Sequence, residues 1–107
     1  MEITAEQLKT KIESGETLLV DFWAPWCAPC RVLKPIFEKL SESINVEENK
    51  ITMYTFDVET NVDLAMSLGV KRVPTVKGFS KGNEVFSRVG FQTELELKDA
   101  LNTTVNG

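Results

Sequence analysis

The sequence contains no histidine, and its 107 residues include only two cysteines, Cys27 and Cys30. A structural zinc site needs four ligands, so this pair supplies half of one unless carboxylates or a second subunit complete it. No apolar run reaches the ~18 residues that a membrane-spanning helix needs. The first residues lack the basic stretch followed by an apolar stretch that is typical of a signal sequence. We therefore expect no metal site and no membrane association.

Positive charge is also scarce. The chain has 12 lysines and arginines against 16 aspartates and glutamates, which gives a net charge of -4 at pH 7. Such a balance disfavours nucleic acids and anionic membrane surfaces as partners. Because no repeat, low-complexity segment or linker divides the chain, we expect residues 1–107 to form a single domain. The expected location is a reducing cytoplasm, where a close cysteine pair is more often catalytic than structural.

The chemically distinctive residues gather in one stretch, residues 23–31. This stretch holds both cysteines, both tryptophans and two of the four prolines, and it joins an apolar strand pattern to a helical pattern. Two residues separate the cysteines, so their sulfurs can join or part with little backbone movement. A structural disulfide gains stability mainly by closing a long loop in the unfolded chain, and this loop is among the shortest possible. The pair therefore favours reversible redox chemistry over a structural disulfide or a metal site.

The helix that follows the motif predicts different roles for the two sulfurs. Its apolar residues recur every three or four positions and are interrupted by a proline that should bend the helix. They are Val32, Leu33, Ile36, Phe37, Leu40 and Ile44, and the proline is Pro35. The free N–H groups and the macrodipole at the start of this helix favour a thiolate. We expect Cys27, nearer the end and more exposed, to be the nucleophile and Cys30, one turn deeper, to be the resolving thiol.

Asp21 is the one acid in the apolar run over residues 17–23. Burial would raise its pKa and make it a candidate proton acceptor. An aspartate at the end of a strand can also point into water, and its position alone leaves this alternative open.

The remaining patterns indicate an α/β order of elements. Strands are predicted over residues 17–23 and 51–58, and the run over residues 70–76 places Pro74 at the start of a further strand. A charged loop is predicted over residues 45–50 and a hairpin turn over residues 80–83. Helices are predicted from the capping boxes Thr4/Gln7 and Thr93/Glu96, and from Asn61 to Gly69. Strand, helix and strand in succession imply that strands 17–23 and 51–58 pair in parallel.

Taken together, the apolar strand with Asp21, the motif Trp26-Cys-Ala-Pro-Cys30, the helix with Pro35, the run Val73-Pro-Thr75 and the pair Val89-Gly90 resemble the thioredoxin family over nearly the whole chain. The resemblance implies an α/β thioredoxin fold, in which helices flank both faces of a central mixed β-sheet. It also implies a dithiol that reduces disulfides in protein substrates without a cofactor of its own. Its electron donor would be a thioredoxin reductase, a flavoprotein that uses NADPH. We expect the chain to act as a monomer.

The resemblance also implies roles for individual residues. Asp21 matches the family's buried acid, which is thought to accept the proton of the resolving cysteine. Pro74 matches a proline held in cis, which presents the backbone of Val73 to an extended substrate. The implied substrate-binding residues are Trp26, Ala28, Pro29, Val73, Pro74, Val89, Gly90 and Phe91. Trp26 and Phe91 are equally consistent with the edge of the core.

Three positions depart from the family pattern. Ala28 stands where a glycine is usual between the first cysteine and the proline. Thr55 stands where the family often has a lysine near the buried acid, so Asp21 should be harder to ionise. Lys77-Gly78 replaces an apolar pair, which predicts a strand that is less well packed or locally reshaped.

Two other functions use the same features. A disulfide isomerase or oxidase is disfavoured by the missing signal sequence and by the lack of histidine between the cysteines. A non-catalytic accessory or binding subunit would use the docking surface and leave the thiols optional.

Overall fold

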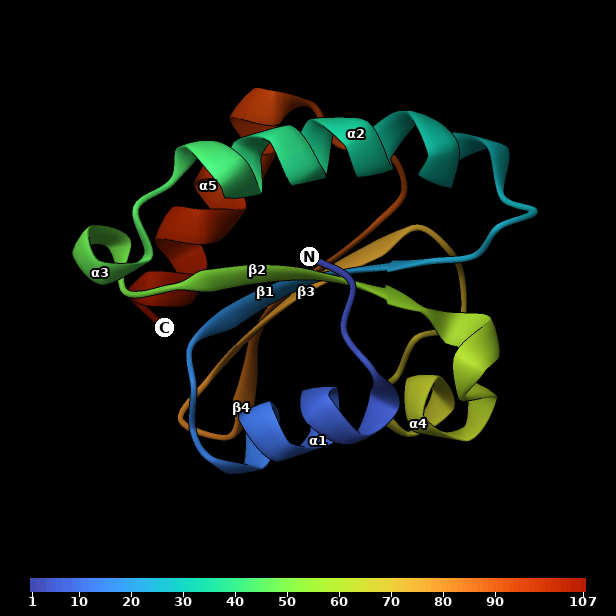
Figure 1. The fold of residues 1–107 in the computed structure, drawn as a ribbon, viewed down its shortest axis with the longest axis horizontal. Helices are drawn as coiled ribbons and strands as arrows, with labels where there is room; N and C mark the ends of the chain where they lie inside the picture. The colour runs from blue at the N-terminus through green and yellow to red at the C-terminus, as the bar shows by residue number, and fades with distance from the viewer.

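The computed structural model describes residues 1–107, and a four-stranded mixed sheet forms its centre (Figure 1). The strand order is β2-β1-β3-β4. The central strand β1 (Leu18–Trp23) pairs in parallel with β2 (Thr52–Asp57) and antiparallel with β3 (Thr75–Ser80). The last strand β4 (Asn83–Val89) pairs antiparallel with β3. The expected α/β fold and the parallel pairing of the first two strands are confirmed.

Helices cover both faces of this sheet. They are α1 (Ala5–Glu13), α2 (Ala28–Ser43), α3 (Val46–Asn49), the 3-10 turn η1 (Val58–Thr60), α4 (Val62–Ser67) and α5 (Glu94–Val105). Figure 1 shows α2 and α5 above the sheet, α1 and α4 below it, and α3 at one end. No helix has the length and apolar content needed to cross a membrane.

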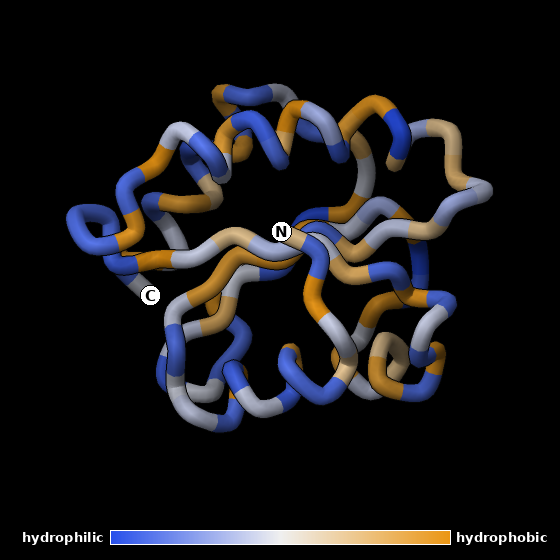
Figure 2. The backbone as a smooth tube through the Cα atoms, in the orientation of Figure 1, coloured by the Kyte–Doolittle hydropathy of each residue, from blue (hydrophilic) through white to orange (hydrophobic).

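Two apolar cores lie on opposite faces of the sheet because successive side chains of a strand alternate in direction. The core between the sheet and helices α1 and α4 includes Leu18, Val20 and Phe22. Leu19 belongs to the core beneath α2 and α5, so Asp21 points to that face as well. Figure 2 shows hydrophobic residues along the central strands and hydrophilic ones on the outer turns.

Local polar signals set the helix ends and the hairpin. Both predicted capping boxes form, at Thr4 with Gln7 and at Thr93 with Glu96. The two residues of the hairpin turn, Lys81 and Gly82, have φ values of 55° and 83°, as a tight turn between twisted strands requires. These predictions are confirmed because each depends on residues that are close in sequence.

The predicted loop over residues 45–50 is wrong, because its middle forms the helix α3. The side chain of Asn45 accepts the N–H of Glu48 at 3.1 Å and so caps the first turn. The helix ends where Lys50 adopts the left-handed conformation, with φ 56°. The segment has no apolar periodicity, so only its cap indicates a helix.

The strand with Pro74 at its start is confirmed, because β3 begins at Thr75, where it pairs with Phe22 of β1. One further prediction is corrected. Val32 does not face the core but is exposed, since the buried stripe of α2 runs through Leu33 and Phe37.

The pair Lys77-Gly78 is locally reshaped, as expected, but it is well packed. The β3–β4 register shifts between Gly78 and Phe79. Lys77 is buried, and its Nζ donates to Glu84 at 2.6 Å and to Ser87 at 3.0 Å. Of the two expected alternatives, the local reshaping is therefore observed and the looser packing is not.

The first residues extend the sheet beyond β2. The N–H of Ile3 donates to the carbonyl of Thr55 at 2.9 Å, and the N–H of Thr55 donates to the carbonyl of Met1 at 2.9 Å. The bridge between Glu2 and Thr55 is parallel, as the short N-terminal run allows. This pairing places Glu2 beside Thr55 of β2.

Candidate active site

The two cysteines form a disulfide at the N-terminus of α2, with their Cα atoms 5.3 Å apart. Cys27 is the N-cap residue, and its Sγ accepts the backbone N–H of Cys30 at 3.3 Å. The positive end of the helix dipole and its free N–H groups therefore act on the outer sulfur. Cys27 is 4% exposed and Cys30 is fully buried, so the expected difference in exposure is present but small.

The run over Val73 and Pro74 passes beside the disulfide, and the peptide bond between them is cis. The carbonyl oxygen of Val73 lies 3.6 Å from the Sγ of Cys27. Neither the N–H nor the carbonyl of Val73 has a backbone partner. The carbonyl of Pro74 accepts the N–H of Gly90 at 2.8 Å, which fixes Gly90 beside this run.

The other residues expected to bind substrate lie on the surface around the motif. Trp26 is 64% exposed and Phe91 is 46% exposed, so both are surface residues rather than parts of the core edge. Val89, Ala28 and Pro29 are exposed as well. The Trp26 indole N–H donates to Glu59 at 2.8 Å, a partner that no pattern in the sequence indicated.

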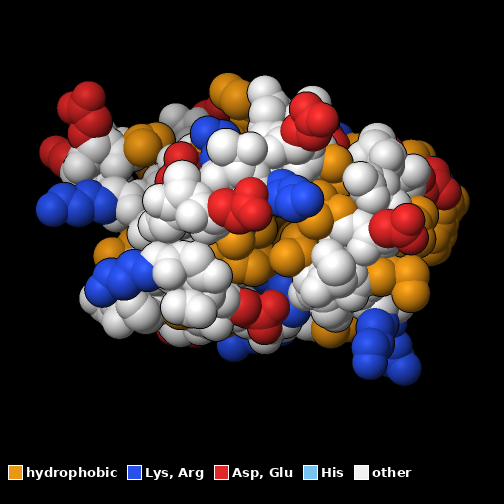
Figure 3. Space-filling model, turned by 90° about the horizontal axis from the view of Figure 1, so that it is seen from below, with side chains coloured by type: hydrophobic (Ala, Val, Ile, Leu, Met, Phe, Trp, Pro, Cys, Tyr) orange, Lys and Arg blue, Asp and Glu red, His pale blue; other side chains and the backbone are white.

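An apolar cleft of about 140 Å³ lies next to Trp26 on the side of α4. Its lining is mostly hydrophobic and consists of Trp26, Val58, Val62, Ala65, Met66, Val70, Lys71, Arg72 and Val73. Figure 3, seen from the side of α1 and α4, shows hydrophobic side chains in the middle and at the right-hand end of this face. Val73 lines this cleft and also lies next to Cys27.

Asp21 is fully buried, and neither of its carboxyl oxygens has a hydrogen-bond partner. Burial raises its pKa to about 7, with smaller upward contributions from Glu2 and Glu38. Lys34 acts in the opposite direction and lowers the pKa. The sequence left open whether this aspartate points into water, and its burial excludes that alternative.

The charged groups around Asp21 are the residues that sequence reasoning missed. Thr55 is the register partner of Asp21, but the Thr55 hydroxyl donates to Glu2 and not to Asp21. The nearby cation is Lys34, which comes from α2 instead of the neighbouring strand. Lys34 and Glu2 lie far apart in sequence, so only the fold reveals their proximity.

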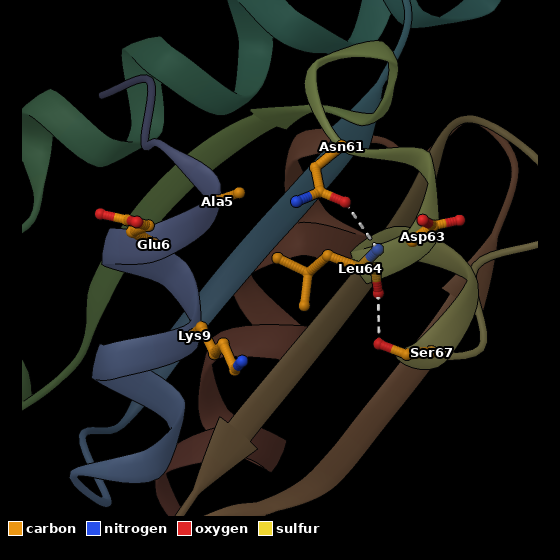
Figure 4. Close-up of a pocket in the computed structure, with 7 residues that line it drawn as sticks. All are labelled: Ala5, Glu6, Lys9, Asn61, Asp63, Leu64 and Ser67. Carbon is orange, nitrogen blue, oxygen red and sulfur yellow. Dashed lines mark hydrogen bonds between the residues drawn. The ribbon is translucent and has the colours of Figure 1, made fainter.

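A second cleft, of about 460 Å³, lies between α1 and α4 (Figure 4). Its lining residues are Ala5, Glu6, Lys9, Asn61, Asp63, Leu64 and Ser67. Asn61 and Ser67 hydrogen-bond to the backbone of Leu64, so these polar groups serve the helix itself. None of the predicted site residues lines this cleft. The structure contains no group of three or more acidic or cysteine side chains placed to hold a metal ion.

Comparison with known proteins places the disulfide in a family context. The thioredoxin family model matches residues 1–103. A thioredoxin from Buchnera aphidicola is 31% identical over 107 residues, covering 99% of this chain and 96% of the relative. The structure of a Malassezia sympodialis thioredoxin matches with a TM-score of 0.81 at 28% identity, covering 95% of this chain and 86% of that one. A mutant thioredoxin from Halobacterium salinarum matches with a TM-score of 0.79 at 34% identity, covering 96% and 88%. The chain therefore belongs to the thioredoxin family of protein-disulfide oxidoreductases, and its Cys27–Cys30 pair carries out dithiol-disulfide exchange.

Proposed function

We propose that the chain reduces disulfides in other proteins, with Cys27 as the nucleophile and Cys30 as the resolving thiol. The observation that carries this proposal is the position of Cys27 at the N-cap of α2, with its Sγ 3.3 Å from the N–H of Cys30. That N–H and the helix dipole stabilise a thiolate on the outer sulfur. Cys30 has no exposed surface, so a partner meets Cys27 first.

The exchange takes place in two steps that balance in atoms and electrons. The Cys27 thiolate attacks one sulfur of the substrate disulfide, and the electron pair of the broken S–S bond leaves on the other sulfur, which takes up a proton. The deprotonated Cys30 then attacks the Sγ of Cys27. A bond forms between Cys27 and Cys30, the bond to the substrate breaks, and the substrate leaves as a dithiol while the protein is oxidised by two electrons.

Asp21 is the proposed acceptor of the Cys30 proton. It lies on the face of β1 that α2 covers, and α2 carries Cys30 in its first turn. Its carboxyl oxygens are free of other partners, and burial raises its pKa to about 7. An acid whose pKa lies near neutral pH can accept a proton in one step and return it in another.

The proposed docking surface surrounds Cys27. An extended substrate segment pairs with the N–H and carbonyl of Val73, which have no backbone partner, as an added strand does. Because that carbonyl lies 3.6 Å from the Sγ of Cys27, such pairing brings a substrate disulfide to the nucleophile. The residues assigned to this surface are Trp26, Ala28, Pro29, Val73, Pro74, Val89, Gly90 and Phe91.

The oxidised protein needs a donor that returns two electrons to the disulfide. Thioredoxin reductase is the usual partner of the family, and we assign that role to such a flavoprotein here. The location that fits a recycled reductase is the cytoplasm, where protein disulfides are mostly transient and catalytic. We assign the monomer as the working form.

The reduction of insulin by dithiothreitol, followed by turbidity, tests the reductase. The wild type should accelerate the reaction over dithiothreitol alone, and Cys27→Ser should not. Cys30→Ser should accumulate a mixed disulfide through Cys27, which intact-protein mass spectrometry detects. If the Cys30→Ser protein turned over repeatedly, the assignment of Cys27 as nucleophile and Cys30 as resolving thiol would be reversed.

If the wild type does not increase the rate of insulin reduction over that with dithiothreitol alone, the reductase proposal is wrong. The exposed apolar surface beside Trp26 would then support the binding role, in which the thiols are optional. Retained binding of a substrate peptide by the Cys27→Ser/Cys30→Ser double variant would mark that outcome.

A further inference from the structure

The carboxylate of Glu2 contacts donor groups from three elements of the fold, β1, β2 and α2. Its Oε1 accepts the indole N–H of Trp23 at 3.0 Å and the hydroxyl of Thr55 at 2.5 Å. The same oxygen lies 3.9 Å from the ammonium of Lys34. Its Oε2 accepts the backbone N–H of Asp57 at 2.9 Å. A surface glutamate with this many partners is held in one place, against its rotamer entropy.

Lys34 is fixed by the same cluster. Its Nζ lies 3.7 Å from the centre of the Trp23 ring, in cation–π contact, and next to Oε1 of Glu2. Glu2 therefore binds both the lysine and the indole on which the lysine rests. Without Glu2, only the ring would hold the long side chain of Lys34.

This cluster lies over the buried carboxyl of Asp21. Trp23 and Asp21 are two residues apart on β1 and so point to the same face of the sheet, and Thr55 is the register partner of Asp21. The charged groups that act on Asp21 are Lys34 and Glu38 from α2 and Glu2 from the N-terminal segment. The facing positions on β2 and β3, Thr55 and Val76, carry no charge.

We propose that Glu2 is a positioning residue for the proton transfer at Asp21, acting by holding Lys34 over the buried carboxyl. This inference rests on the proposed role of Asp21 as the acceptor of the Cys30 proton. It assigns a catalytic consequence to the N-terminal residues, which otherwise only extend the sheet. The Thr55 hydroxyl contributes to the same arrangement. It donates its hydrogen bond to Glu2 and leaves Asp21 without a hydrogen-bond partner.

The two parts of the action of Glu2 on Asp21 have opposite signs. The charge of Glu2 disfavours ionisation of Asp21, whereas the lysine that Glu2 holds favours it. Glu2→Gln keeps Oε1, the atom that meets Trp23, Thr55 and Lys34. It removes the charge and also the bond to the Asp57 N–H, because an NH2 donor replaces Oε2. Glu2→Ala removes the charge, the bond to the Asp57 N–H and Oε1 together. The difference between these variants therefore isolates the positioning of Lys34.

The test is a ¹³C NMR titration of the Asp21 carboxyl in the oxidised protein, where neither cysteine titrates. The midpoint in Glu2→Gln should fall below that of the wild type. The midpoint in Glu2→Ala should lie above that in Glu2→Gln by roughly half a pH unit, because Lys34 is partly exposed and acts more weakly than a buried cation. In a Lys34→Met background the Gln and Ala variants should have the same midpoint. Lys98→Met and Glu94→Gln, on exposed residues of α5, are the charge-matched controls and should leave the midpoint unchanged.

Equal midpoints for Glu2→Gln and Glu2→Ala would overturn the inference, and so would a difference that survives Lys34→Met. The pH dependence of substrate release from the Cys27 mixed disulfide should follow the same order of variants. If the wild type reduces insulin normally but the Asp21 titration midpoints of the Glu2 variants do not differ as expected, only the role of Glu2 fails. If the wild type does not reduce insulin, the proposed function fails, and the role of Glu2 in it fails too.

Discussion

Thr104 of α5 stands directly over Gly78 of β3. A β-carbon at position 78 would lie 2.9 Å from the Cβ of Thr104 and closer still to its hydroxyl. The hydroxyl of Thr104 donates to the carbonyl of Ala100 at 2.8 Å, which holds the side chain in this place. The glycine thus lets α5 approach the centre of the sheet, where a larger residue would push the helix away.

Gly78→Ala should therefore destabilise the fold by about 1–3 kcal/mol, the usual cost of overpacking a core. Urea unfolding of the oxidised protein measures this change. Adding Thr104→Ala should recover part of the loss, because it removes the Oγ1 and Cγ2 atoms that the new methyl group meets but keeps the Cβ of residue 104. Equal losses in the single Gly78→Ala and the double variant would contradict the proposed clash.

This contact illustrates which parts of the fold the sequence predicts. The capping boxes at Thr4 and Thr93 and the turn at Gly82 depend on neighbours three residues away or fewer, and all were predicted correctly. The sequence at Gly78 indicated only a weak strand. Its tight packing depends on Thr104, which is 26 positions further along the chain and meets it only after folding.

The candidate site divides in the same way. The cysteine pair at the start of a helix follows from spacing alone, and the resemblance to a known family supplied the run at Val73 and Pro74. The surroundings of Asp21 did not follow from either. Its charged neighbours come from the N-terminal segment and from α2, so their effect on its pKa appears only once the sheet register is known.

Gln92 is a buried amide without a hydrogen-bond partner for its oxygen or its nitrogen. Burying such a group costs about 1–3 kcal/mol in proteins. Gln92→Met has a similar length and no polar atoms, so it should raise the free energy of unfolding by about 1 kcal/mol or more. Gln92→Glu, which has the same size but adds a charge, should lower it. Urea unfolding at pH 8 checks both, and a stabilised Glu variant would show that the site is not apolar.

Lys77 is a buried cation on β3 whose Nζ lies 2.6 Å from Glu84, a residue with an exposed side chain. Glu84→Gln keeps a hydrogen-bond acceptor but removes the counter-charge, so it should destabilise the fold by about 1–2 kcal/mol. Glu94→Gln breaks an exposed pair with Lys98 and should change stability little. Lys77→Met should suppress the effect of Glu84→Gln. A full effect in that background would mean that Glu84 stabilises the fold without Lys77.

Asp21→Asn should stabilise the oxidised protein, and more so at higher pH. Because burial raises the pKa of Asp21 from 3.8 to about 7, the folded protein keeps this proton after the unfolded chain has lost it. The stability of the wild type therefore falls as the pH rises from about 4 to about 7 and is constant above that. The advantage of the Asn variant in urea unfolding should grow by about 2–3 kcal/mol between pH 5 and pH 8. Asp99→Asn, an exposed control on α5, should show no such growth, and a constant advantage for Asp21→Asn would show that the carboxyl is already ionised at pH 5.

The same carboxyl should set the pH dependence of substrate release from the Cys27 mixed disulfide. Asp21 accepts a proton only when ionised, so the rate in the wild type should rise through a midpoint near its pKa of about 7. Asp21→Asn removes the acceptor and should slow release at pH 7 by about a hundredfold, a typical loss for a positioned base. The rate that remains should then depend on hydroxide and on the Cys30 thiol alone, without the step near pH 7. Stopped-flow release of a chromogenic thiol from preformed mixed disulfide measures this, and an Asn variant that keeps both the rate and the step would remove Asp21 from the proton transfer.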